Sequence, residues 1–189
     1  CPSRSRCEGT AKGLVKALAG CAVEAAAGVA AQRRRLVEDL VALAAAPPCA
    51  LLLASLPHGV AYHHAGLSME ERGLLEAAFR AGALQLLCTT STLSTGVNLP
   101  AHAVVLRSLS MGGERLGVGA FKQMCGRAGR LGGAGGSMAR GEVVIVLEKG
   151  DGDALPRLLG GELEPLRSVL MAPEKRAWAQ GGLEGKGVG

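Results

Sequence analysis

The chain has 189 residues, 48% of them hydrophobic, and a formal charge of +5. This size and composition are typical of one globular domain, or of one domain with part of the next, and they exclude a large multidomain machine. Aromatic residues make up only 2% of the chain, which nearly excludes a binding site built as a cage of stacked aromatic rings. The positive charge permits a polyanionic partner but does not require one.

The six cysteines are far apart and form no C-x-x-C pair, so neither a zinc ribbon nor a disulfide framework is indicated. A reducing compartment fits this pattern best. The sequence has no apolar run of about 18 residues and no signal peptide, so we expect a soluble, intracellular protein without a membrane partner. Because the first residue is Cys1 rather than Met, we also expect the chain to begin inside a longer reading frame.

Residues 8–46 have leucines at three-to-four spacing, which predicts one or two amphipathic helices that end at Pro47-Pro48. The basic cluster at residues 33–35 is interpreted as a solvated helix face, with phosphate contact as the alternative. Ser68 and Glu71 form a capping box that starts a second helical unit. Gly82 is placed to end that unit.

Apolar runs at residues 83–88, 104–106 and 143–147 predict three strands, the last of the kind that is covered on both faces of a parallel sheet. Strands that alternate with helices indicate an α/β domain. Residues 150–161 are expected to be a linker, and residues 181–189 a disordered tail.

The densest chemical signal is FKQMCGRAGR at residues 121–130. If this segment is helical, Gln123, Arg127 and Arg130 share one face, opposite an apolar face. Two guanidiniums on one face suit phosphate oxygens and developing phosphoryl charge. The structural alternative is a surface helix with unpaired arginines. Because glycines in a helix cost about 1 kcal/mol each, their presence suggests that something approaches this segment closely.

A turn rich in hydroxyls, glycine and asparagine follows the first apolar run at residues 89–100. Ligands bind beyond the carboxyl ends of strands in open α/β sheets, which favours a phosphate-binding role over a simple connecting loop. Adjacent His63 and His64 raise the alternative of a metal site with His58. Neighbouring side chains of an extended segment point in opposite directions, so we expect instead one histidine buried against the domain and one facing a cleft.

Taken in order, these segments resemble the second RecA-like motor domain of a superfamily-2 helicase of the superkiller-type group, in the branch of the polymerase-theta helicase domains. The segments that carry the resemblance are CPS at 1–3, HHAGL at 63–67, TSTLSTGVNLP at 90–100 and QMCGRAGR at 123–130. The resemblance implies an α/β fold with a RecA-like parallel sheet flanked by helices at residues 1–149. It also implies the start of a winged-helix domain at residues 162–180.

The resemblance also implies roles for individual residues. Arg127 and Arg130 would be the catalytic arginine fingers on the ATP phosphates, and Gln123 would couple the cleft. Gly96 and Asn98 would face the nucleotide. The nucleic-acid-binding set would be Ser3, His64, Gly66, Thr89, Thr90 and Thr92.

The sequence contains no GxxxxGK[ST] phosphate loop and no DExH acidic box. The ligands of Mg²⁺ are therefore expected on the first RecA-like domain of the same polypeptide, and this chain alone should not hydrolyse ATP. The leading hypothesis is the C-terminal motor half of an ATP-dependent nuclear DNA helicase that acts in DNA repair on single-stranded or forked DNA. The alternatives are an RNA helicase of the same group, a non-catalytic nucleic-acid-binding module, and a degenerate fragment.

Overall fold

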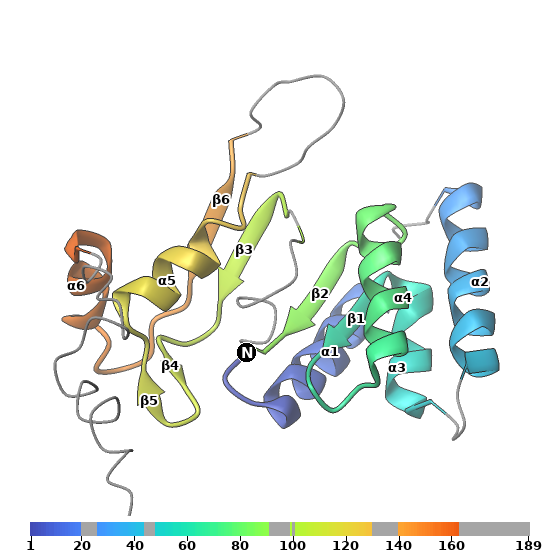
Figure 1. Ribbon diagram of the computed structural model, residues 1–189, viewed down its shortest axis with the longest axis horizontal. Coiled ribbons are helices and arrows are strands. Elements are labelled where there is room, and N and C mark those ends of the chain that lie inside the picture. Colours follow the sequence, from blue (N-terminus) through green and yellow to red (C-terminus); the bar gives the residue numbers. More distant parts are fainter. Residues whose placement is uncertain (20–25, 44–47, 91–98, 100, 130–139, 163–189) are drawn as a thin grey trace, which may run out of the picture.

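The computed structural model describes residues 1–19, 26–43, 48–90, 99, 101–129 and 140–162 (Figure 1). Its helices are α1 (Arg4–Ala19), α2 (Ala27–Leu43), α3 (Ala50–Ser55), the 3₁₀ helix η1 (Leu56–His58), α4 (Met69–Arg80), α5 (Val118–Cys125) and α6 (Ala154–Gly160). Its strands are β1 (Val60–His63), β2 (Leu86–Thr89), β3 (Ala103–Leu106), β4 (Ser110–Met111), β5 (Glu114–Arg115) and β6 (Glu142–Ile145). No helix in the described ranges combines the length and apolar character needed to cross a bilayer.

The described strands form three two-stranded sheets. β1 pairs with β2 and β3 pairs with β6, both in parallel, whereas β4 and β5 form an antiparallel hairpin. The α/β prediction is confirmed, and all three expected strands are present with shifted ends. β1 was not expected as a strand, and within the described ranges the two parallel pairs are not joined into one sheet.

The first half of the molecule, residues 1–90, has its core around β1. All four residues of this strand are buried, because α1 and α4 both contact it. Tyr62, Leu40 and Leu52 are among the largest fully buried side chains there. The two expected helices at residues 8–46 are confirmed as α1 and α2, and the buried side chains Leu36 and Leu40 supply the apolar stripe of α2.

The capping box at the start of α4 is confirmed. The Ser68 hydroxyl accepts a hydrogen bond from the Glu71 amide at 3.0 Å, and the Glu71 carboxylate accepts one from the Ser68 amide at 2.7 Å. At the other end of the helix, Gly82 has a φ of +76°, a conformation that favours glycine. Two local signals in the sequence therefore define both ends of this helix.

Arg33 is buried, so the prediction of a solvated face for residues 33–35 is wrong at this position. Its Nε donates to the Ala83 carbonyl oxygen at 2.9 Å, and its Nη1 donates to the Pro57 carbonyl oxygen at 2.7 Å. A further hydrogen bond joins Nη2 to the Gln85 side chain. The rigid guanidinium fork thus satisfies acceptors in the segments that lead into β1 and β2, while the other two arginines of the cluster are exposed.

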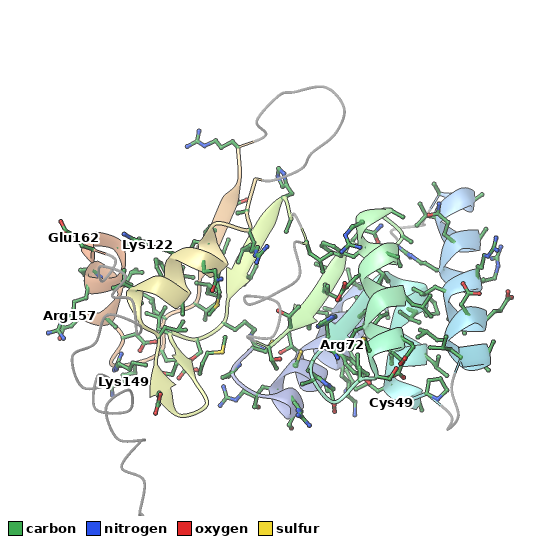
Figure 2. All side chains as sticks on the ribbon, in the orientation of Figure 1. Cys49, Arg72, Lys122, Lys149, Arg157 and Glu162 are labelled. Carbon is green, nitrogen blue, oxygen red and sulfur yellow. The ribbon has the colours of Figure 1, made fainter. Side chains whose placement is uncertain are left out.

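The second half, residues 101–162, has a smaller core. Leu106, Leu109, Phe121 and Leu158 form its buried cluster. Leu158 belongs to α6, which lies inside the segment 150–161 that the sequence predicts as a linker. This segment is therefore partly helical and packed against α5. The Lys122 ammonium, labelled in Figure 2, strengthens this packing with a hydrogen bond to the carbonyl oxygen that follows α6, at 2.7 Å.

The last parallel strand departs from its expected environment. The sequence predicts that residues 143–147 are covered on both faces, but Val144, Val146 and Leu147 are exposed by 41–47%. Ile145 of β6 packs in the same cluster as Phe121 of α5, whereas Val144 is exposed on the alternate face of the strand and Val146 and Leu147 follow its end. Residues 163–189, with the expected winged-helix start beyond residue 162 and the tail, lie outside the described part of the chain.

His63 ends β1 and is almost completely buried. Its Nε2 lies 2.9 Å from Oε1 of Glu76 on α4. Burial lowers the pKa of His63, and this effect exceeds the opposing influence of the Glu76 carboxylate. The Nδ1 atom has no hydrogen-bond partner among the described residues, so a proton there would be a buried donor without an acceptor.

Replacement of Arg33 by methionine should lower the free energy of unfolding of this chain by about 2–3 kcal/mol, because it leaves buried carbonyl oxygens without donors. The matched control is Arg34→Met, one residue along the same helix and exposed. This change should cost less than about 0.5 kcal/mol. Urea denaturation followed by circular dichroism measures both values, and equal losses in the two variants would contradict the assignment.

The lowered pKa of His63 predicts how stability depends on pH. In the unfolded chain the His63 side chain takes up a proton as the pH falls through about 6.5, whereas in the folded protein it does so only at lower pH. The free energy of unfolding should therefore be unaffected by His63 above about pH 6.5 and should decline below it. The decline from this one group is at most about 1.4 kcal/mol per pH unit. In the His63→Gln variant the decline between pH 6.5 and 5 should be smaller, whereas the exposed control His58→Gln should leave it unchanged. Urea unfolding across this range is the measurement.

Candidate nucleic-acid and nucleotide interface

Four of the proposed nucleic-acid-binding residues lie at one edge of the β1–β2 sheet. His64 and Gly66 follow β1, and Thr89 and Thr90 lie at and after the end of β2. Because the two strands are parallel, with His63 opposite Thr89, their carboxyl ends meet. The Thr90 amide donates to the His63 carbonyl oxygen at 3.3 Å and continues the pairing. We call this edge, together with the start of α1, the carboxyl edge.

Ser3 joins the carboxyl edge through the start of α1. Its hydroxyl accepts a hydrogen bond from the Arg6 amide at 3.3 Å, which is the geometry of a helix N-cap. The nitrogen of Cys1 donates to the Thr89 carbonyl oxygen at 2.7 Å. The structure therefore brings five of the six residues together. The sixth, Thr92, lies outside the described residues.

His64 is buried as well, with 4% of its surface exposed. Its Nε2 lies 3.0 Å from Oε1 of Glu8 on α1, and its ring stacks on Tyr62 with 5.2 Å between centroids. The expectation that one of the two histidines faces a cleft is wrong. Successive side chains on β1 do point in opposite directions, but α4 covers one side of the strand and α1 covers the other.

Gly66 is exposed and lies against His64. The Gly66 amide donates to Nδ1 of His64 at 3.1 Å. A Cβ atom at Gly66 would lie 3.0 Å from the same nitrogen, which is closer than nearly all real contacts of this kind. A side chain at this position would therefore require the His64 ring to move by a few tenths of an ångström.

The helical part of residues 123–130 is shorter than predicted. α5 ends at Cys125, and the next amides form tight turns, with the Arg127 amide donating to the Met124 carbonyl oxygen at 3.1 Å. Gly129 has a φ of +77°. The prediction that Gln123, Arg127 and Arg130 share one helical face is therefore wrong for Gln123 and Arg127, because Arg127 lies beyond the helix. Arg130 lies outside the described residues.

The segment after α5 unwinds because it pairs with the chain that leads into β3. The Ala101 amide donates to the Arg127 carbonyl oxygen at 3.2 Å, and the Gly129 amide donates to the Ala101 carbonyl oxygen at 2.9 Å. A Cβ atom at Gly141 would lie 2.5 Å from the carbonyl carbon of Ala128. The close approach that the glycines suggested thus includes the chain's own backbone.

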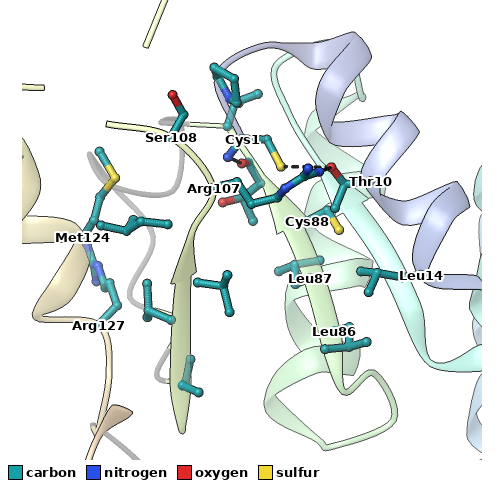
Figure 3. A pocket seen from close by; sticks show the side chains of 18 of the residues that line it. Cys1, Thr10, Leu14, Leu86, Leu87, Cys88, Arg107, Ser108, Met124 and Arg127 are labelled. Carbon is teal, nitrogen blue, oxygen red and sulfur yellow. Dashed lines mark hydrogen bonds between the residues drawn. The ribbon is translucent and has the colours of Figure 1, made fainter. Parts of the chain in front are cut away.

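Gln123 is exposed on α5, and Arg127 is half-buried. Arg127 lines a cavity of about 710 Å³ between β2 and β3, which we call the slot. Figure 3 shows Cys1 and Ser108 at one end of the slot and Arg127 towards the other. Both strands line it along their whole length. The remaining nucleotide residues, Gly96, Asn98 and Arg130, lie outside the described part of the chain.

The described residues contain no group of three or more histidine, cysteine, aspartate or glutamate side chains that could hold a metal ion. His63 and His64 instead contact carboxylates on two different helices.

Two residues of this region were missed by the sequence analysis. Glu8 contacts His64 across 56 positions of sequence. Arg107 crosses the mouth of the slot, and its Nη1 donates to the Thr10 hydroxyl at 2.5 Å (Figure 3). Both contacts join elements that are distant in the chain, so no local spacing could have indicated them.

Comparison with known proteins identifies the family. The model of the helicase conserved C-terminal domain matches residues 28–132. The chain is 46% identical to DNA polymerase theta of Mus musculus over 116 residues, which are 61% of this chain and 4% of that protein. It is 37% identical to Helicase POLQ-like of Homo sapiens over 171 residues, which are 90% of this chain and 15% of that protein.

The chain is also 37% identical to the ATP-dependent DNA helicase Hel308 of Pyrobaculum calidifontis over 192 residues, which are 97% of this chain and 26% of that protein. It therefore spans about a quarter or less of the length of these relatives. The matched residues include β1, β2 and the segment that carries Arg127. The chain belongs to the helicase conserved C-terminal domain family.

Proposed function

We propose that this chain is the second motor domain of an ATP-dependent DNA helicase that acts in nuclear DNA repair. The observation that carries the proposal is that two groups of residues from different elements meet around the slot, which Thr89, Thr90 and Arg127 all line. Ser3, Gly66, Thr89 and Thr90 gather at the carboxyl edge, whereas Arg127 lies beyond the end of α5, next to the start of β3. A motor needs one surface for the strand and another for the nucleotide.

The carboxyl edge suits the backbone of a single DNA strand. Ser3 and Gly66 are exposed and Thr89 and Thr90 are half-buried, so the edge presents a hydroxyl and a stretch of backbone on its exposed side. Such groups bind phosphate and sugar oxygens without reading sequence. Thr92 is proposed to extend the same surface. The low aromatic content of the chain agrees with contacts to the backbone rather than with base stacking.

Arg127 is proposed to act as an arginine finger towards ATP bound on the first motor domain of the same polypeptide. A guanidinium stabilises the charge that develops on the transferred phosphoryl group. Gln123, Arg130, Gly96 and Asn98 are proposed to complete the nucleotide surface. Mg²⁺ is proposed to be held by the first motor domain, because this sequence contains no GxxxxGK[ST] phosphate loop and no DExH acidic box.

The slot supports a RecA-like sheet. β2 and β3 each have one edge that faces the slot and forms no ladder among the described residues. Because parallel sheets are normally continuous and covered, we propose that one further parallel strand lies between them and joins both pairs. The winged-helix start beyond residue 162 remains a further proposal of the same kind.

Substitution of Arg127 by alanine in the full-length polypeptide should reduce DNA-stimulated ATP turnover by about 10³-fold, because the transition state loses its cationic partner. Affinity for single-stranded DNA should change by less than about threefold, since the carboxyl edge is untouched. The control is Arg34→Ala, which removes an exposed arginine of α2. Unchanged turnover in the Arg127 variant would contradict the nucleotide role. DNA binding that never responds to ATP in the wild-type protein would favour a non-catalytic binding module.

Hydrogen–deuterium exchange of the full-length polypeptide tests the proposed central strand. With a strand in the slot, amides of β2 and β3 should exchange as slowly as those of β1, because both edges are then paired. The exposed hairpin strand β5 provides the fast reference. Exchange of β2 or β3 at the rate of β5 would rule out the continuous sheet.

A further inference from the structure

We infer that Glu8 is a positioning residue for DNA binding. Through His64 it fixes the turn at residues 64–67, which forms part of the carboxyl edge. The inference rests on the proposed DNA-binding role of that edge. Glu8 itself lies on α1 and belongs to none of the helicase-like segments that the sequence reveals.

The hydrogen bonds define the direction of the contact. Nδ1 of His64 accepts the hydrogen bond from the Gly66 amide, so it carries no proton. The proton of the neutral ring is therefore on Nε2, which donates to the Glu8 carboxylate at 3.0 Å. The carboxylate sets the orientation of the ring, and the ring in turn holds the backbone of the turn.

His64 has no freedom to contact DNA directly. The ring is buried, with Tyr62 stacked at 5.2 Å and an interplanar angle of 18°. Gly66 lies against its edge, so close that a Cβ atom there would press on the ring at 3.0 Å from Nδ1. The role given to His64 by the resemblance is therefore revised. The histidine does not contact DNA itself but holds the backbone of the turn that forms part of the DNA-binding edge. The exposed parts of that surface are the backbone of the turn and its neighbours.

Arg4 is one of those neighbours. Its Nη1 lies 3.5 Å from the position that a Cβ atom would occupy at Gly66, and the side chain is exposed at the start of α1. Glu8 lies one turn further along the same helix. The Glu8–His64 contact thus holds the turn beside a guanidinium that is free to meet a phosphate.

The charge of Glu8 makes the inference testable by the sign of the effect. A carboxylate near bound DNA repels phosphates, so its removal should strengthen binding if charge were its only influence. Loss of a positioning contact should weaken binding instead. The two explanations therefore predict opposite changes for the same substitution.

The experiment measures binding of a fluorescent single-stranded oligonucleotide to the full-length polypeptide across a range of salt concentrations. Glu8→Ala should weaken binding about tenfold without changing the slope of log affinity against log salt, because no phosphate contact is lost. Glu8→Gln, which retains an acceptor for Nε2–H, should restore binding to within about threefold of wild type. Arg4→Ala should instead reduce the slope by about one. Glu38→Ala, which removes an exposed carboxylate of α2, is the matched charge control and should not weaken binding.

Circular dichroism establishes that each variant is folded. If Glu8→Ala does not fold, Gly66→Ala displaces the ring from its other side and should give the same loss of affinity at an unchanged salt slope. Wild-type affinity or tighter binding in the tested variant would overturn the inference while leaving the proposed function intact. Absence of DNA binding by the wild-type polypeptide would instead overturn the proposed function.

Discussion

The enclosure of β1 between two helices is the constraint on which the first half depends. Each histidine at the end of this strand contacts a carboxylate on a different helix, His63 with Glu76 on α4 and His64 with Glu8 on α1. Burying a polar group without a partner is costly on a strand that is covered on both sides, and each of these ring nitrogens has its partner on a covering helix. The turn after β1 and the end of β2 lie together at the carboxyl edge.

Short sequence patterns predicted those parts of the fold that depend on interactions between residues close together in the chain. The capping box at Ser68 and the φ of Gly82 depend on residues within one turn of each other, and both ends of α4 were predicted from them. The apolar runs predicted β2, β3 and β6 for the same reason. β1, which ends at His63, was not predicted as a strand; polar residues are tolerated in such a strand where long-range partners satisfy them.

Long-range contacts decided the rest. Arg33 is buried because acceptors 24 to 52 positions away surround it, and no helical pattern encodes them. α5 ends before Arg127 because the segment that follows pairs with Ala101. The helix propensities of the residues in this segment do not decide between a longer helix and this pairing. Of the candidate site, the grouping at the carboxyl edge followed from the family resemblance. The burial of His64 and its dependence on Glu8 did not.

The packing of Gly141 against Ala128 and Gly129 has a consequence for the way this family can vary. The two ends of the intervening stretch, at residues 129 and 140–141, are clamped side by side by backbone contact. Chain added between them lengthens a connection whose two ends are already held together, and the entropic cost of this is only about 0.6 kcal/mol for each doubling of its length. Insertions in this stretch therefore cost little conformational entropy, and they need not move Arg127.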